Sequence, residues 1–104
     1  VLLLPDGLKT IEKCAFSDCS SLVNLFLPKS LTKIDDDAFS NCSQLKNLEY
    51  LGTNTNVSGS PFKNGSSISD LYLPNVDTSK TNDFTNFLGK NWNGHIYAKK
   101  HIPS

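Results

Sequence analysis

The chain has 104 residues, which allows one domain with a modest core and excludes a two-domain enzyme. Ten Lys balance ten Asp and Glu, and Arg is absent, so the chain lacks both the positive field and the bidentate side chain with which proteins commonly hold phosphates and bases. We therefore expect no nucleic-acid partner, and no apolar run approaches the roughly 20 residues of a membrane helix.

A repeat with a period of 23 residues organises the chain. The sequence LLLPDGLKTIEKCAFSDCSSLVNL begins at Leu2 and aligns without a gap with LFLPKSLTKIDDDAFSNCSQLKNL, which begins at Leu25. A fixed period of this length indicates stacked units of similar structure, so we expect a single domain over residues 1–104. Because Leu2, Leu4, Leu8 and Ile11 belong to inward columns with no preceding coil or cap to cover them, we expect this domain to be a piece of a longer repeat array. Its coils are predicted over residues 2–24, 25–47, 48–70 and 71–95, with a final strand and tail over 96–104.

Each coil is predicted to begin with a short strand. Leu25, Phe26 and Leu27 alternate in the way that places two leucines on one face, and Pro28 ends the strand. Strands from successive coils would then lie about 4.8 Å apart in a parallel sheet. The corresponding leucine column contains Leu2, Leu25, Leu48 and Leu71, and in the longer last coil the pattern returns at Ile96, 25 residues after Leu71.

The opposite side of each coil is predicted to be a loop or a single helical turn. Asp35–Asp37 offers acceptors to the free amides of a helix start ahead of Ala38 and Phe39. Each coil directs about seven apolar side chains inward, and only a neighbouring coil can cover them. We expect Phe16, Phe39 and Phe62 to form one column along the stack.

The last coil is predicted to end the stack. Phe87 falls in the phenylalanine column when the two additional residues of this coil are taken into account. Phe84, Leu88 and Trp92 are large apolar residues that would cover the end of the core.

The unit L-x-L-P-x-x-L-x-x-I-x-x-x-A-F-x-x-C-x-x-L, present from Leu2 to Leu22 and from Leu25 to Leu45, closely resembles the BspA-type leucine-rich repeat. The fold class predicted here is α/β to mainly β: a right-handed leucine-rich-repeat solenoid of about four coils, with a parallel sheet on one face and short helical turns or loops opposite. The resemblance further implies a non-enzymatic binding module of a cell-surface or secreted protein, although no secretory signal is visible in this chain. It implies protein or glycan partners, such as a host matrix protein or another microbe.

The exposed side of the predicted sheet is the candidate binding site. Residues between the inward leucines should point to solvent and form a column that begins at Leu3 and is rich in aromatic rings, with a polar column beside it. Aromatic anchors with polar neighbours are typical of docking surfaces, whereas strand propensity alone is the alternative explanation. The predicted binding residues are Phe26, Glu49, Tyr72, Tyr97, Asn24, Asn47, Asp70 and His95.

No catalytic residue, metal site or cofactor is predicted. Cys19 and Cys42 occupy an inward column, where buried thiols behave as small apolar groups and are expected to be reduced, whereas Cys14 is expected to be exposed. Asp35–Asp37 lacks the ligand spacing of a calcium loop. Two alternatives to a binding module are a structural spacer or docking repeat in a larger protein and, last, a thiol-dependent hydrolase that uses Cys14 and a histidine.

Overall fold

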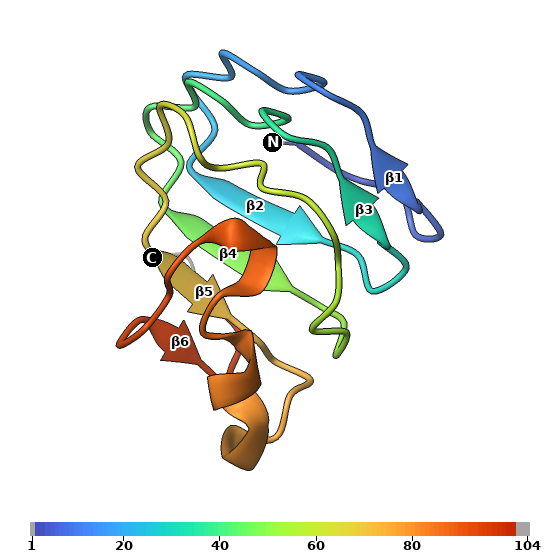
Figure 1. The fold of residues 1–104 in the computed structure, drawn as a ribbon, viewed down its shortest axis with the longest axis vertical. Helices are drawn as coiled ribbons and strands as arrows, with labels where there is room; N and C mark the ends of the chain where they lie inside the picture. Colours follow the sequence, from blue (N-terminus) through green and yellow to red (C-terminus); the bar gives the residue numbers. More distant parts are fainter. Residues whose placement is uncertain (1, 102–104) are drawn as a thin grey trace.

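The computed structural model describes residues 2–101. Its main element is a four-stranded parallel sheet in which the strands lie side by side in sequence order (Figure 1). Among residues 2–101, no helix combines the length and apolar character needed to cross a bilayer. The strands of this sheet are β2 (Asn24–Leu27), β4 (Asn47–Tyr50), β5 (Asp70–Tyr72) and β6 (Ile96–Tyr97).

The pairing of these strands confirms the predicted columns. Leu25 pairs with Leu48, and Leu48 with Leu71, so leucines of three successive repeats are neighbours on one face. Leu71 then pairs with Ile96, which confirms the longer last step. All three leucines are almost fully buried, which agrees with an inward face that each repeat covers for the next.

The first predicted strand is not formed. The segment from Leu2 to Leu4 has no strand structure, and β2 is the outermost strand of the sheet. Leu2 and Leu4 are partly buried against the core, but Leu3 is 82% exposed and does not begin the exposed column of the sheet. Outermost strands gain ladder hydrogen bonds on one side only, and at the other edge of the sheet β6 is likewise reduced to two residues.

A second parallel ladder, which the sequence pattern did not predict, joins neighbouring repeats away from the main sheet. It pairs β1 (Thr10–Ile11) with β3 (Lys33–Ile34) and continues as a single bridge from Lys33 to Ser58 (Figure 1). Ile11 and Ile34 are buried in this ladder. Successive repeats are therefore hydrogen-bonded on two sides of the core.

The side of the repeats that carries the phenylalanines consists of turns. Asp35–Asp37 forms no helix, because the positive φ of 64° at Asp37 interrupts the helical path. Two separate turns form instead, closed by hydrogen bonds from the Ala38 amide to the Asp35 carbonyl and from the Ser40 amide to the Asp37 carbonyl. The amide of Phe16 instead donates to the carbonyl of Ala38 in the next repeat at 2.9 Å. The short helices are both in the last repeat: η1 (Thr78–Phe84) and η2 (Phe87–Gly89).

The phenylalanine column is present as predicted for the first three repeats. Ring centroids of Phe16 and Phe39 are 5.4 Å apart, and those of Phe39 and Phe62 are 5.8 Å apart. The prediction for Phe87 was wrong: this ring stacks on Tyr50 at 4.9 Å, and Trp92 meets Phe62 edge-on at 6.2 Å. Trp92 therefore takes the position beside Phe62 that was predicted for Phe87. The two short 3₁₀ helices explain this difference, because they alter the spacing of side chains along the last repeat.

The last repeat adds a second group of buried side chains. Phe84, Phe87, Leu88 and Trp92 are each no more than 3% exposed. The indole N–H of Trp92 donates to the carbonyl of Phe87 at 2.7 Å, which satisfies the ring's polar group inside the core. Parallel sheets with few helices and a core continuous between repeats fit an α/β repeat fold.

Candidate binding surface on the parallel sheet

The residues predicted to bind a partner lie together on one side of the main sheet, which we call the strand face. Strand pairing aligns Phe26 with Glu49, Glu49 with Tyr72, and Tyr72 with Tyr97. Beside this column, the pairing aligns the residues at the start of the strands, because the same register holds along each strand. That second row contains Asn24, Asn47 and Asp70, and His95 directly precedes β6.

The aromatic part of the strand face is formed by Tyr72 and Tyr97. Their rings stack with centroids 4.9 Å apart and an interplanar angle of 27°, and both side chains are partly buried. Burial raises the pKa of Tyr72, and the neighbouring Asp70 and Tyr97 raise it further, so the phenol stays neutral at physiological pH. The Lys99 ammonium lies 5.8 Å from the centre of the Tyr97 ring, within the range of a cation–π contact.

The polar row is held by hydrogen bonds between repeats. The side-chain amide of Asn47 donates to the side-chain oxygen of Asn24 at 2.8 Å. The Nδ1 atom of His95 lies 3.1 Å from a carboxylate oxygen of Asp70. These contacts restrict the side chains before any partner arrives, so less rotamer entropy remains to be lost on binding.

Two members of the strand face are not exposed, contrary to the prediction. Glu49 is 7% exposed and Asn47 is 8% exposed. The covering group is His101, whose backbone N–H donates to a carboxylate oxygen of Glu49 at 2.6 Å. The ring of His101 lies over Tyr72 with centroids 4.7 Å apart, and its Nε2 atom is 3.4 Å from the side-chain nitrogen of Asn47. His101 has no counterpart in the repeat pattern, so the repeat alignment does not predict this contact.

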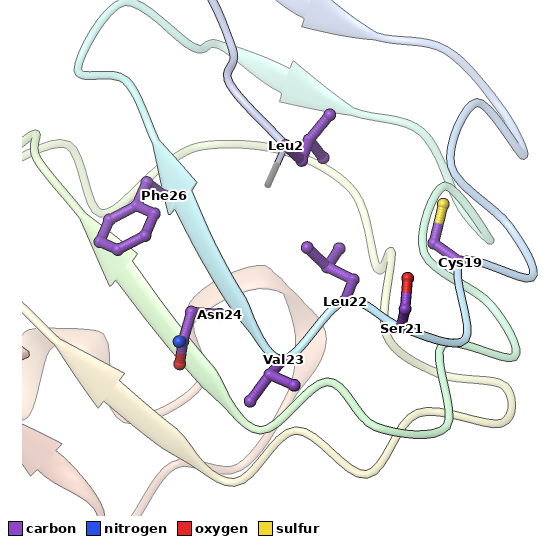
Figure 2. Close-up of a pocket in the computed structure, with 7 residues that line it drawn as sticks. All are labelled: Leu2, Cys19, Ser21, Leu22, Val23, Asn24 and Phe26. Carbon is purple, nitrogen blue, oxygen red and sulfur yellow. The ribbon is translucent and has the colours of Figure 1, made fainter. Parts of the chain in front are cut away.

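An apolar hollow of about 530 Å³ lies beside the outer edge of β2 (Figure 2). Leu2 and Leu22 line one part of it, and Asn24 and Phe26 extend it to the strand face. Val23, which also lines the hollow, is 46% exposed. The remaining lining residues are Cys19 and Ser21.

The three cysteines are free. The predicted exposure is confirmed for Cys14 and Cys42, whereas Cys19, which was expected to be buried like Cys42, is only partly so and lines the hollow. Cys14 is exposed, Cys19 is partly buried and Cys42 is buried. Burial raises the pKa of the Cys42 thiol, which donates to the carbonyl of Phe16 at 3.3 Å. These features identify Cys42 as a packing residue. Within the part of the chain that the structure describes, no three His, Cys, Asp or Glu side chains are grouped as a metal site would require.

Comparison with known families agrees with this geometry. The model of the BspA-type leucine-rich repeat region, which is described as containing six copies, matches residues 2–91. The chain belongs to this family. No curated protein and no solved structure matches it. BspA-type leucine-rich repeats suggest a protein-binding module, and proteins that contain them are typically secreted or displayed at the cell surface.

Proposed function

We propose that this BspA-type repeat chain is a non-enzymatic binding module that recognises a partner protein through its strand face. The observation that carries the proposal is the alignment of Tyr72 and Tyr97, which are stacked beside Asp70. Aromatic rings with few torsional degrees of freedom, fixed next to charged groups, supply most of the binding energy in many protein interfaces. A glycan that stacks on the two tyrosines is the other partner class to be tested.

The same proposal places the chain in a larger extracellular assembly. In this proposal the chain is a single domain, a right-handed solenoid of about four coils, and it belongs to a longer array on a secreted or surface-displayed adhesin. Its support is the outer side of the first coil, where Leu3 is 82% exposed and Leu2, Leu4 and Phe16 are only partly buried, so that a further coil would cover them.

The test replaces Phe26, Tyr72 and Tyr97 with Ser in one variant and measures its binding to an array of host matrix proteins, microbial surfaces and glycans. Circular dichroism and thermal unfolding first establish that the variant is folded. The expected result is a loss of at least about tenfold in affinity, since each truncated anchor typically contributes more than about 1 kcal/mol.

A matched control replaces Glu12 and Lys13, both exposed and outside the strand face, with Ser. This control removes one charge of each sign and should bind as the unaltered chain does. If the triple variant also binds normally, the strand face is not the docking surface, and the repeats serve as a spacer for other domains.

A further inference from the structure

The segment that follows β6 turns back across the strand face and ends, in the described part of the chain, at His101. Building on the proposed function, we infer that residues 98–101, Ala-Lys-Lys-His, are an internal occupant of the binding site. The partner that this site takes is an extended basic peptide segment with a histidine, which must displace residues 98–101 to bind. Three contacts on the strand face support this inference.

The first contact recognises a peptide backbone. Glu49 is 7% exposed and accepts the backbone N–H of His101 at 2.6 Å, which is a short, charge-assisted hydrogen bond. Every non-proline residue of an extended peptide offers this donor, so the interaction requires a peptide but not a particular side chain. A carboxylate at this position would repel an acidic partner and leave its own charge buried without a donor.

The second contact recognises a ring. The imidazole of His101 lies over Tyr72 with centroids 4.7 Å apart and an angle of 48° between the planes. Its Nε2 atom is 3.4 Å from the side-chain nitrogen of Asn47, a group that can only donate. One N–H of this amide already donates to Asn24. An imidazole with an acceptor at Nε2 can take the second N–H, whereas an aliphatic side chain would leave it without a partner.

The third feature is that the segment and the strand face carry charges of opposite sign. Lys99 and Lys100 precede His101, and the Lys99 ammonium lies 5.8 Å from the centre of the Tyr97 ring. The strand face supplies carboxylates from Glu49 and Asp70 and carries no lysine among its eight residues. An acidic surface with stacked tyrosines therefore complements a basic segment.

The internal segment is suited to displacement because its contacts are concentrated at His101 and the two lysines before it are not buried. Lys99 and Lys100 are exposed, and β6 has only two paired residues. Occupied and open forms can then exchange, and an external peptide binds with an affinity reduced by the fraction of molecules that is open. The segment thus lowers the apparent affinity for an external peptide but leaves the residues of the site unchanged.

The internal contact is tested first, by NMR spectroscopy of the full chain. In the Glu49→Gln variant, which removes the charge of the acceptor, the amide proton of His101 is expected to move upfield. The Asp70→Asn variant is the matched control, because it removes a carboxylate from the same face that has no contact with the His101 amide, and it should leave this resonance in place. If the two variants give the same small shift, residues 98–101 do not occupy the strand face and the inference is overturned.

Binding is then tested with the acetylated and amidated peptide Ala-Lys-Lys-His, with Ala-Lys-Lys-Ala as the control peptide. Both are titrated into the full chain and into its His101→Ala variant. The histidine peptide is expected to bind the variant about fivefold more tightly than the unaltered chain, which corresponds to a segment that occupies the site roughly four-fifths of the time. Adding Glu49→Gln to the variant should weaken that binding.

Equal affinity of the histidine peptide for both chains, equal binding of the two peptides, or no binding to the variant would each overturn the inference. Failure of the proposed function would give a different pattern of results. The triple serine variant would bind the partner normally, and the NMR contact of His101 with Glu49 would still be observed in the unaltered chain.

Discussion

The rings of Phe39 and Phe62 stack with centroids 5.8 Å apart, although one whole repeat separates the two residues in the sequence. Phe16 stacks on the other side of Phe39 at 5.4 Å. Phe39 is fully buried by its two neighbours, whereas Phe16 has a neighbour on one side only and is partly exposed. Each repeat therefore depends on the adjacent ones for the burial of its largest side chain.

Phe39→Ala is expected to lower the free energy of unfolding by about 3 to 5 kcal/mol, because it leaves a cavity between two rings that cannot close. Phe16→Ala should cost less, since water already reaches part of that ring. Urea unfolding followed by circular dichroism measures both losses. Phe39→Leu, which leaves a smaller void, provides a folded variant if the alanine variant does not fold, and equal losses at residues 16 and 39 would contradict this account.

Gly59 is expected to be intolerant of a side chain. A Cβ atom at this position would collide with the backbone carbonyl oxygen of Ile34, and the residue has a φ of +108°. Gly7 is the matched control, because its φ is +89° but nothing lies within 4 Å of its Cβ position. Gly7→Ala should cost only the conformational strain of about 1 to 2 kcal/mol, and Gly59→Ala roughly 3 kcal/mol or more. Similar melting temperatures for the two variants would show that the close approach is absent.

The start of η1 is expected to make stability depend on acidic pH. Asp77 accepts hydrogen bonds from the backbone amide and the hydroxyl of Ser79, both at 2.9 Å, and these bonds lower the pKa of its carboxyl group from its ordinary value. A lowered pKa in the folded state means that Asp77 stabilises the fold above its unfolded pKa, and that this contribution is lost as pH falls through the folded value. Thermal unfolding between pH 2 and pH 6 should therefore show a smaller acid-induced loss in Asp77→Asn, and identical profiles would contradict the assignment.

Alkylation is expected to distinguish the three thiols. Cys14 is exposed and should react first with iodoacetamide under native conditions. Cys42 is buried with a raised pKa, so at neutral pH it has little thiolate and should react only on unfolding. Mass spectrometry of digests taken over time gives the order of modification. Early labelling of Cys42 would mean that the phenylalanine side of the repeats opens readily.

The sequence was sufficient to predict the register of the main sheet, because identical side chains recur at a fixed spacing. Leu25, Leu48 and Leu71 could be aligned without knowing the fold, and the shift to Ile96 followed from the longer last repeat. The same reasoning placed Tyr72 beside Tyr97. Periodic positions are predictable since each one repeats the environment of the last.

Features outside the period could not be predicted in this way. β1 has two residues and no alternating pattern, and the burial of Trp92 against Phe62 depends on how two short 3₁₀ helices fold. His101 also lies outside every repeat column, so the covering of Glu49 depends on a single contact between segments 52 residues apart. A contact that occurs once in the chain leaves no recurring pattern in the sequence from which it could be predicted.

Two parallel ladders, that of the main sheet and that of β1 with β3, join successive repeats. They restrict the insertions by which a gene for such an array can lengthen. Duplicating one complete block of 23 codons would add one strand to the main sheet, one phenylalanine to the stacked column and one pairing like that of β1 with β3. The main sheet would become wider by about 4.8 Å. Adding one or two codons within a block would instead put the leucines and the phenylalanines out of phase with those next door. The length of such an array can therefore change only by whole repeats.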